Sequence, residues 1–456
     1  MRIRLNTIFY FILAADLALY FILFDGTSPY LDGSSILYYI IFTSCILFTV
    51  IINGKRNNIF LELLIAIVIV AYHFRIPILF CPDVPTIMAR ISISSALING
   101  KILELSYHYL ALSLAIVILN PRIGRSNYYV DKRVAKKVLW FSSAIIFFDM
   151  AMSIVSGYGQ LSSLMGPFSI VIAVFSRNTA MLFVMTYVVA AGRTLSRSHK
   201  YWAAALIVSF VVHGLYSGLK GSIALLIIYY MLATLLCYGP ISINAKKVVR
   251  AAMLLPLIGL SFFTGDIMRY FQRGVIGGEG VVDRFRMIGS ASSNILYTVS
   301  SRLGLFDYYV EASENSLYLP YISFKYYCTS IVDKLTPGFD VFGSVYASRM
   351  FAYARQGGFP KIMHSDQMTL FGEASVMFSS LSIIWFVGMI VFFAFLVRIR
   401  PSSDSFINIF YVAVVFHAYW EWLYGFGFDM FLCQATIYPI ICVSCMLWYC
   451  RFGCHK

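Results

Sequence analysis

Residues 34–53 read SSILYYIIFTSCILFTVIIN, twenty positions without one charged side chain. An α-helix needs about twenty apolar residues to cross the hydrocarbon core of a bilayer. Eleven further stretches approximate this pattern, so that twelve helices are predicted in all, at 6–24, 34–53, 59–80, 102–119, 138–155, 168–191, 201–218, 222–239, 251–265, 379–397, 405–425 and 430–450. The sequence therefore predicts an all-α, polytopic membrane bundle of about twelve transmembrane helices.

The composition excludes a soluble globular protein. Hydrophobic residues make up 60% of the chain and charged residues 12%, whereas charged residues approach about a quarter of a soluble domain. The formal net charge of +14 is also found in nucleic-acid-binding proteins. Here, however, the basic residues lie in short loops at alternate ends of apolar runs, which is the pattern that orients membrane proteins. We therefore expect membrane lipids, and no nucleic acid, as partners.

The basic loops also predict an orientation. If the N-terminus is cytoplasmic, the inner segments hold most of the basic residues outside the long loop, namely Arg2, Arg4, Lys55, Arg56, Arg122, Arg125, Lys132, Arg133, Lys136, Lys137, Arg193, Arg197, Lys200, Lys246, Lys247, Arg250, Arg398, Arg400, Arg451 and Lys456. The short outer loops hold Arg90 and Lys101, together with Lys220 in the turn between the predicted seventh and eighth spans. Because positive residues favour the cytoplasmic side, both termini are predicted to be inside.

Residues 266–378 form the one long segment that does not read as membrane helix. They carry ten basic and ten acidic residues, and in this topology they lie outside. The chain thus divides into helices one to nine (1–265), a large outer loop (266–378) and helices ten to twelve (379–456). Helical spacing at 292–310 and a tyrosine-rich run at 317–335 predict amphipathic helices lying on the membrane surface.

The spans contain a few ionisable side chains, which are costly there and commonly face a polar cavity. Arg177 lies near the middle of the predicted sixth span, and Asp149 in the fifth is its natural partner. A structural ion pair and a contact with substrate are both consistent with this placement. Glu421 and Asp429 lie near the outer ends of the last two spans, where they are expected to be interfacial anchors.

Two outer segments are rich in glycine and cations. Lys220 lies in the turn SGLKGS (217–222), seven residues after His213, and it either extends to the membrane surface or binds an anion. Just beyond the predicted ninth span, four arginines surround a group of glycines: Arg269, Arg273, Arg284 and Arg286. Because guanidinium groups bind phosphate oxygens in pairs, this segment is either a self-paired surface loop or a site for a lipid diphosphate.

His364 is the one histidine of the long loop. Ser365 is predicted to cap a helix that follows it, and the dipole of that helix favours a neutral imidazole, which can accept a proton. Asp366 and Glu373 are seven residues apart and hence are predicted on one helical face. His364 is therefore a candidate base, with Asp366 or Glu373 assisting, although a lone histidine is also consistent with a structural role.

The cysteines permit one disulfide in this topology. Cys81 and Cys328 are the cysteines placed outside by this topology, which permits a disulfide between them. No pattern of metal ligands is present, so neither a metal nor another cofactor is expected.

Three features together resemble a known family. They are the topology with a dominant late outer loop, the turn SGLKGS at 217–222, and the stretch MTLFGEASVMF at 368–378, which is similar to a Gly-Glu element near the end of that loop. Arg269 and Gly280 also fit an Arg, ten residues, Gly pattern. The chain resembles the bacterial O-antigen polymerases and, more distantly, the O-antigen ligases. Lys220 stands where relatives often carry arginine, and lysine binds phosphate as a point charge rather than as a fork.

The resemblance implies a multi-pass protein of the bacterial inner (cytoplasmic) membrane that polymerises undecaprenyl-diphosphate-linked oligosaccharide repeat units at the periplasmic face. It also implies a chain-length regulator and a flippase of the same pathway as partners. On this interpretation the diphosphate is held by cations: Arg269, Arg273, Lys220, Arg177, Arg284 and Arg286. Base catalysis then falls to His364 with Asp366 or Glu373, and no metal is needed because diphosphate is already a good leaving group.

Three alternatives stay open. A ligase transferring glycan to the lipid A core shares the topology. A transferase using polyprenyl-monophosphate sugars usually carries acidic residues in a long first outer loop, whereas the loop here, 25–33, is short. A flippase or exporter would transport glycan without forming glycosidic bonds; many transporters show inverted repeats, which this sequence lacks.

Overall fold

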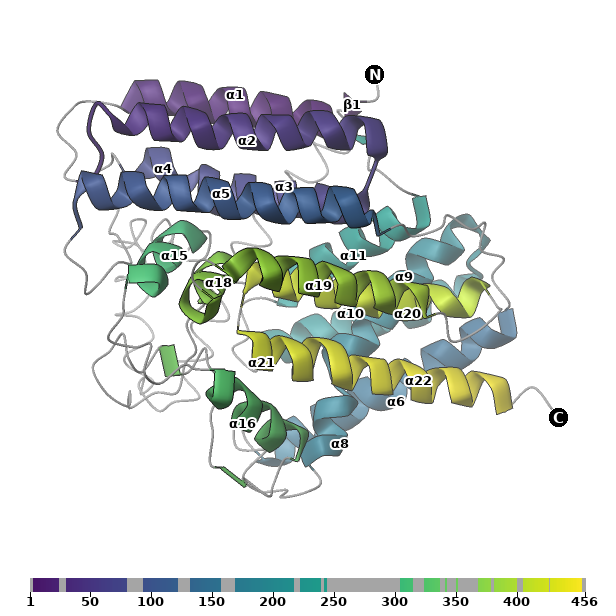
Figure 1. Ribbon diagram of the computed structural model, residues 1–456. Coiled ribbons are helices and arrows are strands. Elements are labelled where there is room, and N and C mark those ends of the chain that lie inside the picture. The colour runs from purple at the N-terminus through teal and green to yellow at the C-terminus, as the bar shows by residue number, and fades with distance from the viewer. Residues whose placement is uncertain are drawn as a thin grey trace, which may run out of the picture.

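The computed structural model describes residues 3–23, 30–79, 93–121, 132–156, 169–216, 222–238, 242–243, 304–314, 324–336, 341–342, 350–351, 368–378, 381–399, 405–425 and 427–452. The predicted ninth span, 251–265, lies outside these ranges. Within them the chain is almost entirely helical, as Figure 1 shows.

The first helices form a layer along one side of the bundle (Figure 1). They are α1 (Leu5–Leu23), α2 (Ser35–Arg56), α3 (Ile59–Val68) and α5 (Ser95–Leu119), with α2 packed against both α1 and α5. Two asparagines form the tight turn between α2 and α3. Asn57 ends α2 in the left-handed conformation, and the Asn58 side chain then caps α3 by accepting from the Phe60 and Leu61 amides, as expected for asparagine at these positions.

The predicted third span is interrupted by a π-turn. After α3 come the π-helical residues η1 (Ile69–His73) and the short α4 (Arg75–Ile78). A π-turn inserts an extra residue into the helix and is frequent at functional sites. Here the π-turn ends at His73 and lies next to Arg75, and these two side chains contact different neighbours.

A second group of helices surrounds α9 (Arg177–Ala191), which packs against α6 (Lys132–Ser156), α10 (Arg197–Tyr216) and α11 (Ser222–Tyr238). The predicted sixth span is divided into α8 (Ser169–Val174) and α9. Ser176 starts the second piece, because its hydroxyl accepts from the Thr179 amide at 3.3 Å. The break places Arg177 at the first position of α9.

The C-terminal helices are α19 (Ser382–Arg398), α20 (Ser405–Tyr424), α21 (Phe428–Met430), the π-helical η5 (Phe431–Ile437) and α22 (Tyr438–Phe452). They join the two groups, since α19 packs on α5 while α20 packs on α9 and α11. One continuous apolar core therefore runs through the described part of the bundle.

Three described helices come from the long loop: α15 (Leu305–Glu314), α16 (Phe324–Leu335) and α18 (Leu370–Phe378). Figure 1 places all three at one end of the bundle, which we call the loop end. The N-terminus and the C-terminus lie toward the opposite end (Figure 1), which we call the basic end because Lys55, Arg56, Arg133, Lys136 and Arg398 are there.

The chain is a multi-pass helical membrane protein. Within the described ranges, six helical stretches are long and apolar enough to cross a bilayer: Asn6–Leu23, Ser35–Arg56, Ile59–Ile78, Ser95–Leu119, Ile170–Ala191 and Phe428–Cys450. Two shorter apolar helices, Ile223–Tyr238 and Ser382–Arg398, coincide with the predicted eighth and tenth spans. Helices α6, α10 and α20 coincide with the predicted fifth, seventh and eleventh.

The predicted start of the fourth span was wrong. The fourth helix begins at Ser95 rather than near residue 102, because the Ser94 hydroxyl caps it by accepting from the Leu97 amide at 3.2 Å. Lys101, which was assigned to an outer loop, lies in the second turn of this helix. A helix that starts earlier brings Lys101 and Glu104 under the loop helices.

Two short strands link distant parts of the chain. β1 (Ile3–Arg4) pairs antiparallel with β2 (Ser242–Ile243), and Ile3 is opposite Ile243. The start of the chain therefore lies on the same side of the bundle as the segment that follows α11. This agrees with the sequence-based expectation that both segments are on one side of the membrane.

Candidate functional site

The loop end holds the candidate site, and its centre is the start of α18. Thr369 has a positive φ of 63° and directs its amide to the Gly425 carbonyl at 3.1 Å. Its hydroxyl accepts from the Gly372 amide at 3.0 Å, and its carbonyl from the Glu373 amide at 2.9 Å. Thr369 is thus the residue that starts α18.

This start corrects the prediction that Ser365 caps the helix. Because α18 begins at Leu370 and Thr369 is not helical, Asp366 and Glu373 do not share one continuous helix. The sequence pattern could not show the break, since threonine with positive φ is uncommon and is held here by contact with the distant Gly425.

Gly425 at the end of α20 permits this close approach. Its φ is 77°, and a Cβ built on it would lie 2.3 Å from the Leu370 nitrogen.

We expect Gly425→Ala to destabilise the protein by about 2 kcal/mol, the range of a strained backbone position. Thermal unfolding in detergent measures this. The control is Gly100→Ala in α5, where nothing lies within 4 Å of a new Cβ; equal midpoints for the two variants would contradict the contact.

Glu373 projects from α18 into a closed polar cluster. Its residue exposure is 2%, and its Oε1 accepts from the Phe428 amide at 2.6 Å. Burial raises the pKa of Glu373 to about 7, and the charge of Asp429 adds to the rise, although hydrogen bonds from Tyr327 and from the Phe428 backbone lower the pKa. The carboxyl can therefore hold or release a proton near neutral pH, but it can reach a substrate only through its neighbours.

Helix α16 closes this cluster from the other side. The Tyr327 hydroxyl is buried beside Glu373 and lies 3.8 Å from the Met368 sulfur. Burial raises the pKa of Tyr327 well above its usual value, so it remains a hydrogen-bond donor. One turn further along α16, the Ser330 hydroxyl donates to Asp429 Oδ2 at 2.6 Å.

Asp429 was expected to be an interfacial anchor, and this was wrong. Its residue exposure is 0%, and it is held by Ser330 and by the Met430 amide at 2.8 Å. Gly427, with φ of 110°, turns the chain so that Asp429 points inward beneath α16. Position near a predicted span end could not reveal that a loop helix covers it.

Two ion-pair groups hold α15 on the bundle. Arg75 of α4 makes two bonds to Asp307, from Nε to Oδ1 at 2.9 Å and from a terminal nitrogen to Oδ2 at 2.7 Å, and both side chains are at most 3% exposed. Lys101 pairs with Glu104 and with Glu314 at the end of α15, each at 2.8 Å.

The same group reaches α18. The Ser375 hydroxyl donates to Glu104 Oε1 at 2.8 Å, and His108, one turn below Glu104, stacks on Phe371 with ring centroids 6.5 Å apart. Because α15 itself packs on α18, these contacts fix the position of Glu373 relative to the membrane helices.

Arg177 lies in a second polar group, within the spans. Its Nε is 3.5 Å from Asp149 Oδ2, it contacts the His213 ring nitrogen, and its guanidinium carbon is 5.9 Å from the centre of the Phe210 ring. The predicted Asp149 partner is confirmed. In the adjoining helices His417 lies 3.4 Å from Glu421 and 5.3 Å, between ring centres, from Tyr229.

A third polar group was missed by the sequence reading. His73 Nδ1 is 2.9 Å from Asp16 Oδ2, and its Nε2 is 2.8 Å from the Thr43 hydroxyl. That hydroxyl donates to the Tyr39 carbonyl at 2.7 Å, so His73 Nε2 is the donor to Thr43. Inspection of every ionisable residue in the predicted spans would have singled out Asp16, His73 and Arg75.

Most of the predicted site residues lie outside the described part of the chain: His364, Asp366, Lys220, Arg269, Arg273, Arg284 and Arg286. Glu373 and Arg177 are the described ones, and they lie in separate polar groups. Cys328 is a free, exposed thiol, and Cys81 is outside the described residues. Among the described residues no group of three or more His, Cys, Asp or Glu is placed to hold a metal ion.

No family model, curated protein or solved structure matches the chain.

Proposed function

We propose that this chain is a glycosyltransferase of the bacterial inner membrane that polymerises undecaprenyl-diphosphate-linked oligosaccharide repeat units, as O-antigen polymerases do. The observation that supports it best is the packing of α15, α16 and α18 at the loop end, where Glu373 is buried with a pKa near 7. In the sequence these helices belong to the 266–378 segment, which also carries His364 and the arginines. The proposal includes twelve spans with both termini in the cytoplasm.

The reaction joins two lipid-linked glycans. A hydroxyl oxygen at the non-reducing end of a new repeat attacks the anomeric carbon of the growing chain. The bond between that carbon and the diphosphate oxygen breaks, and the diphosphate leaves with the electron pair. The proton of the attacking hydroxyl passes to a base. Atoms and charge balance without an oxidant or reductant, and catalysis requires a base together with cations at the leaving group.

Roles follow from residue chemistry. His364 takes the proton, assisted by Asp366 or Glu373. Since Glu373 is 2% exposed, we give it a positioning role, through Tyr327 and the Phe428 backbone, rather than direct contact with a sugar. The leaving diphosphate is held by cations of the outer segments: Arg269, Arg273, Arg284, Arg286 and Lys220.

Arg177 is a less direct contributor to phosphate binding. Its pairing with Asp149 offsets part of its positive charge, and its side chain is 13% exposed. It lies at the start of α9. We therefore assign Arg177 a supporting role in binding the diphosphate.

The test is product analysis of the full chain reconstituted in lipid vesicles with an undecaprenyl-diphosphate-linked repeat unit. We expect a ladder of polymers. His364→Ala should lower its rate about 10²- to 10⁴-fold, the range of general-base catalysis, and Arg269→Ala about 10²- to 10³-fold, the effect of removing one group that stabilises developing charge. Lys325→Ala, an exposed cation on α16, is the matched control. A ladder that survives both site variants would contradict these roles.

The alternatives give different products. Transfer of the glycan to lipid A core without lengthening would indicate a ligase. Movement of the intact lipid-linked glycan across the vesicle, with no new glycosidic bond, would indicate a flippase or exporter. Either result would overturn the proposed polymerisation.

A further inference from the structure

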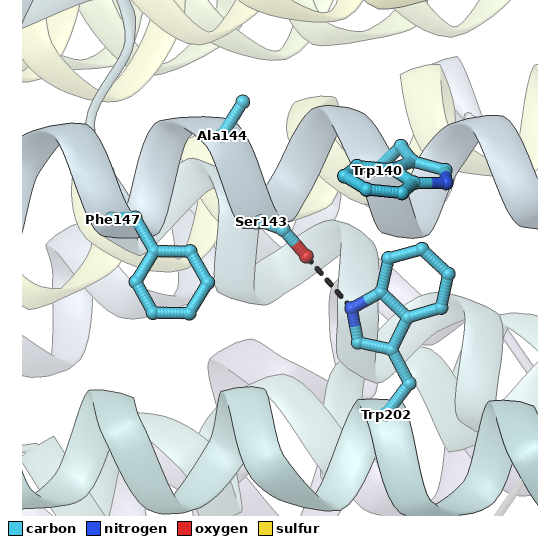
Figure 2. Close-up of a pocket in the computed structure, with 5 residues that line it drawn as sticks. All are labelled: Trp140, Ser143, Ala144, Phe147 and Trp202. Carbon is cyan, nitrogen blue, oxygen red and sulfur yellow. Dashed lines mark hydrogen bonds between the residues drawn. The ribbon is translucent and has the colours of Figure 1, made fainter.

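An apolar groove lies between α6 and α10, and it shares no residue with the candidate site. It encloses about 490 Å³ and is lined by Trp140, Ser143, Ala144, Phe147 and Trp202, shown in Figure 2. Trp140 and Phe147 are each 56% exposed. On a membrane helix such exposed rings face lipid, so the groove opens toward the bilayer.

The walls of the groove are held in place internally. The two tryptophan rings meet edge to face, with centroids 5.1 Å apart and planes at 86°. Trp202 Nε1 donates to the Ser143 hydroxyl at 2.9 Å (Figure 2), and that hydroxyl donates to the Leu139 carbonyl at 2.8 Å. Because these polar atoms are already bonded to one another, the groove offers an apolar ligand a preformed surface.

Two basic residues lie on the same face of α6 as the groove, nearer the basic end. Arg133 and Lys136 precede Trp140 by seven and four residues, and Ala144 and Phe147 follow it by four and seven. These spacings put all five on one helical face, and all five are exposed. At a rise of about 1.5 Å per residue, Lys136 is about 6 Å along the helix axis from Trp140.

The charge at this end favours an anionic ligand. Besides Arg133 and Lys136, the described helix ends there carry Lys55, Arg56 and Arg398. In the described part of the chain, Glu62 is the acidic residue at this end, and its side chain is buried, with a residue exposure of 3%. The exposed charges described there are therefore positive. Tryptophan is also typical of the headgroup level of a bilayer. The end of the groove that carries the tryptophans is therefore expected at the depth where acyl chains meet phosphates.

We propose that this groove is a binding site for an anionic glycerophospholipid. One acyl chain lies between Trp140, Phe147 and Trp202, and the headgroup phosphate lies against Lys136 and Arg133. Basic positions between membrane helices on the cytoplasmic side bind acidic headgroups in this way. The site involves none of the residues assigned to glycosyl transfer, so it stands independently of the proposed function.

Tryptophan fluorescence of the full chain in nanodiscs tests the site. Phosphatidylglycerol brominated along its acyl chains is titrated into phosphatidylcholine discs, and the same titration is made with brominated phosphatidylcholine. We expect the anionic lipid to quench at a lower mole fraction. Trp202→Phe, which keeps an aromatic wall, should remove part of that preferential quenching and thereby assign it to the groove among the six tryptophans of the chain.

Charge variants separate the site from general surface attraction. Lys136→Gln and Arg133→Gln should each lower the preference for phosphatidylglycerol about fivefold, the effect of one basic residue near an anionic surface. Lys55→Gln, an exposed cation at the same end on α2, should leave it unchanged. Because Lys136 is exposed, its replacement leaves the core intact.

Three results would overturn the proposal. Equal quenching by the two lipids would show a general lipid contact without headgroup selection. A loss with Lys55→Gln as large as that with Lys136→Gln would show diffuse attraction. Protection of the tryptophans from both lipids would show that another part of the protein, or a second copy of it, fills the groove.

Discussion

Arg75→Ala is expected to destabilise the folded protein by roughly 3 to 5 kcal/mol, the cost of leaving one member of a buried ion pair without its partner. The two bonds between Arg75 and Asp307 join a membrane span to α15, and both side chains are at most 3% exposed. The remaining Asp307 carboxylate would lose its bidentate partner in a place that water does not reach. Unfolding of the purified protein in detergent, followed by circular dichroism, gives the loss.

Two comparisons isolate this pair. Glu314→Gln breaks the Lys101–Glu314 bond, in which the glutamate side chain is 36% exposed, and should cost at most about 1 kcal/mol. Arg75→Met combined with Asp307→Leu replaces both charges by apolar groups and should recover most of the stability lost in Arg75→Ala. If Arg75→Ala costs no more than Glu314→Gln, the pair does not hold α15.

Loss of the Arg75–Asp307 pair should also affect α18. Helix α15 packs against α18, which carries Glu373, so release of α15 loosens the candidate site without touching it. Hydrogen exchange of the α18 amides should therefore rise in Arg75→Ala. In Glu314→Gln it should stay near the level of the unaltered protein, because the bidentate pair remains.

The membrane helices were largely predictable because their signal is local. A run such as 34–53 is long and apolar enough to predict a membrane-spanning helix on its own, and the structure has α2 at Ser35–Arg56. Deviations arose where a polar side chain decided the boundary. The Ser94 cap extends α5 by seven residues beyond its apolar core, and Ser176 divides the predicted sixth span, because a cap depends on one hydroxyl rather than on average hydropathy.

The site was less predictable because its contacts join residues far apart in the sequence. The pairing of Arg177 with Asp149 could be predicted, since each is an ionisable group in a neighbouring span. By contrast, the contact between Thr369 and Gly425 and the bond from Ser330 to Asp429 each depend on how the loop helices dock. A charge count treats Asp307 and Glu373 as loop residues, whereas the structure buries both.

A fall in stability with rising pH is the second large effect expected, and it comes from Glu373. Burial raises the pKa of this carboxyl from 4.5 to about 7, so the folded state binds its proton more tightly than the unfolded state. The resulting stabilisation is fully present below about pH 4.5 and is lost as the pH rises through 7. A shift of this size corresponds to roughly 3 kcal/mol.

Glu373→Gln tests this dependence because glutamine resembles the protonated carboxyl and can still accept from the Phe428 amide. The variant should be more stable than the unaltered protein at pH 8, by up to about 3 kcal/mol, and nearly equal to it at pH 4.5. Unfolding midpoints measured across this range give the slope. Glu314→Gln supplies the background, since its carboxyl is at the surface; equal slopes in both variants would show that Glu373 is solvated.

The same experiment separates a structural role for Glu373 from its proposed assistance in proton transfer. Above pH 7 the ionised Glu373 carboxylate is buried beside Asp429 and lowers the stability of the folded state. Glu373→Gln is therefore expected to have the higher free energy of unfolding. Assistance in proton transfer requires the ionised form, which glutamine cannot supply. Glu373→Gln should therefore gain stability and lose polymerisation at pH 8. If Glu373 were purely structural, the same variant would gain stability at pH 8 and keep its polymerisation activity.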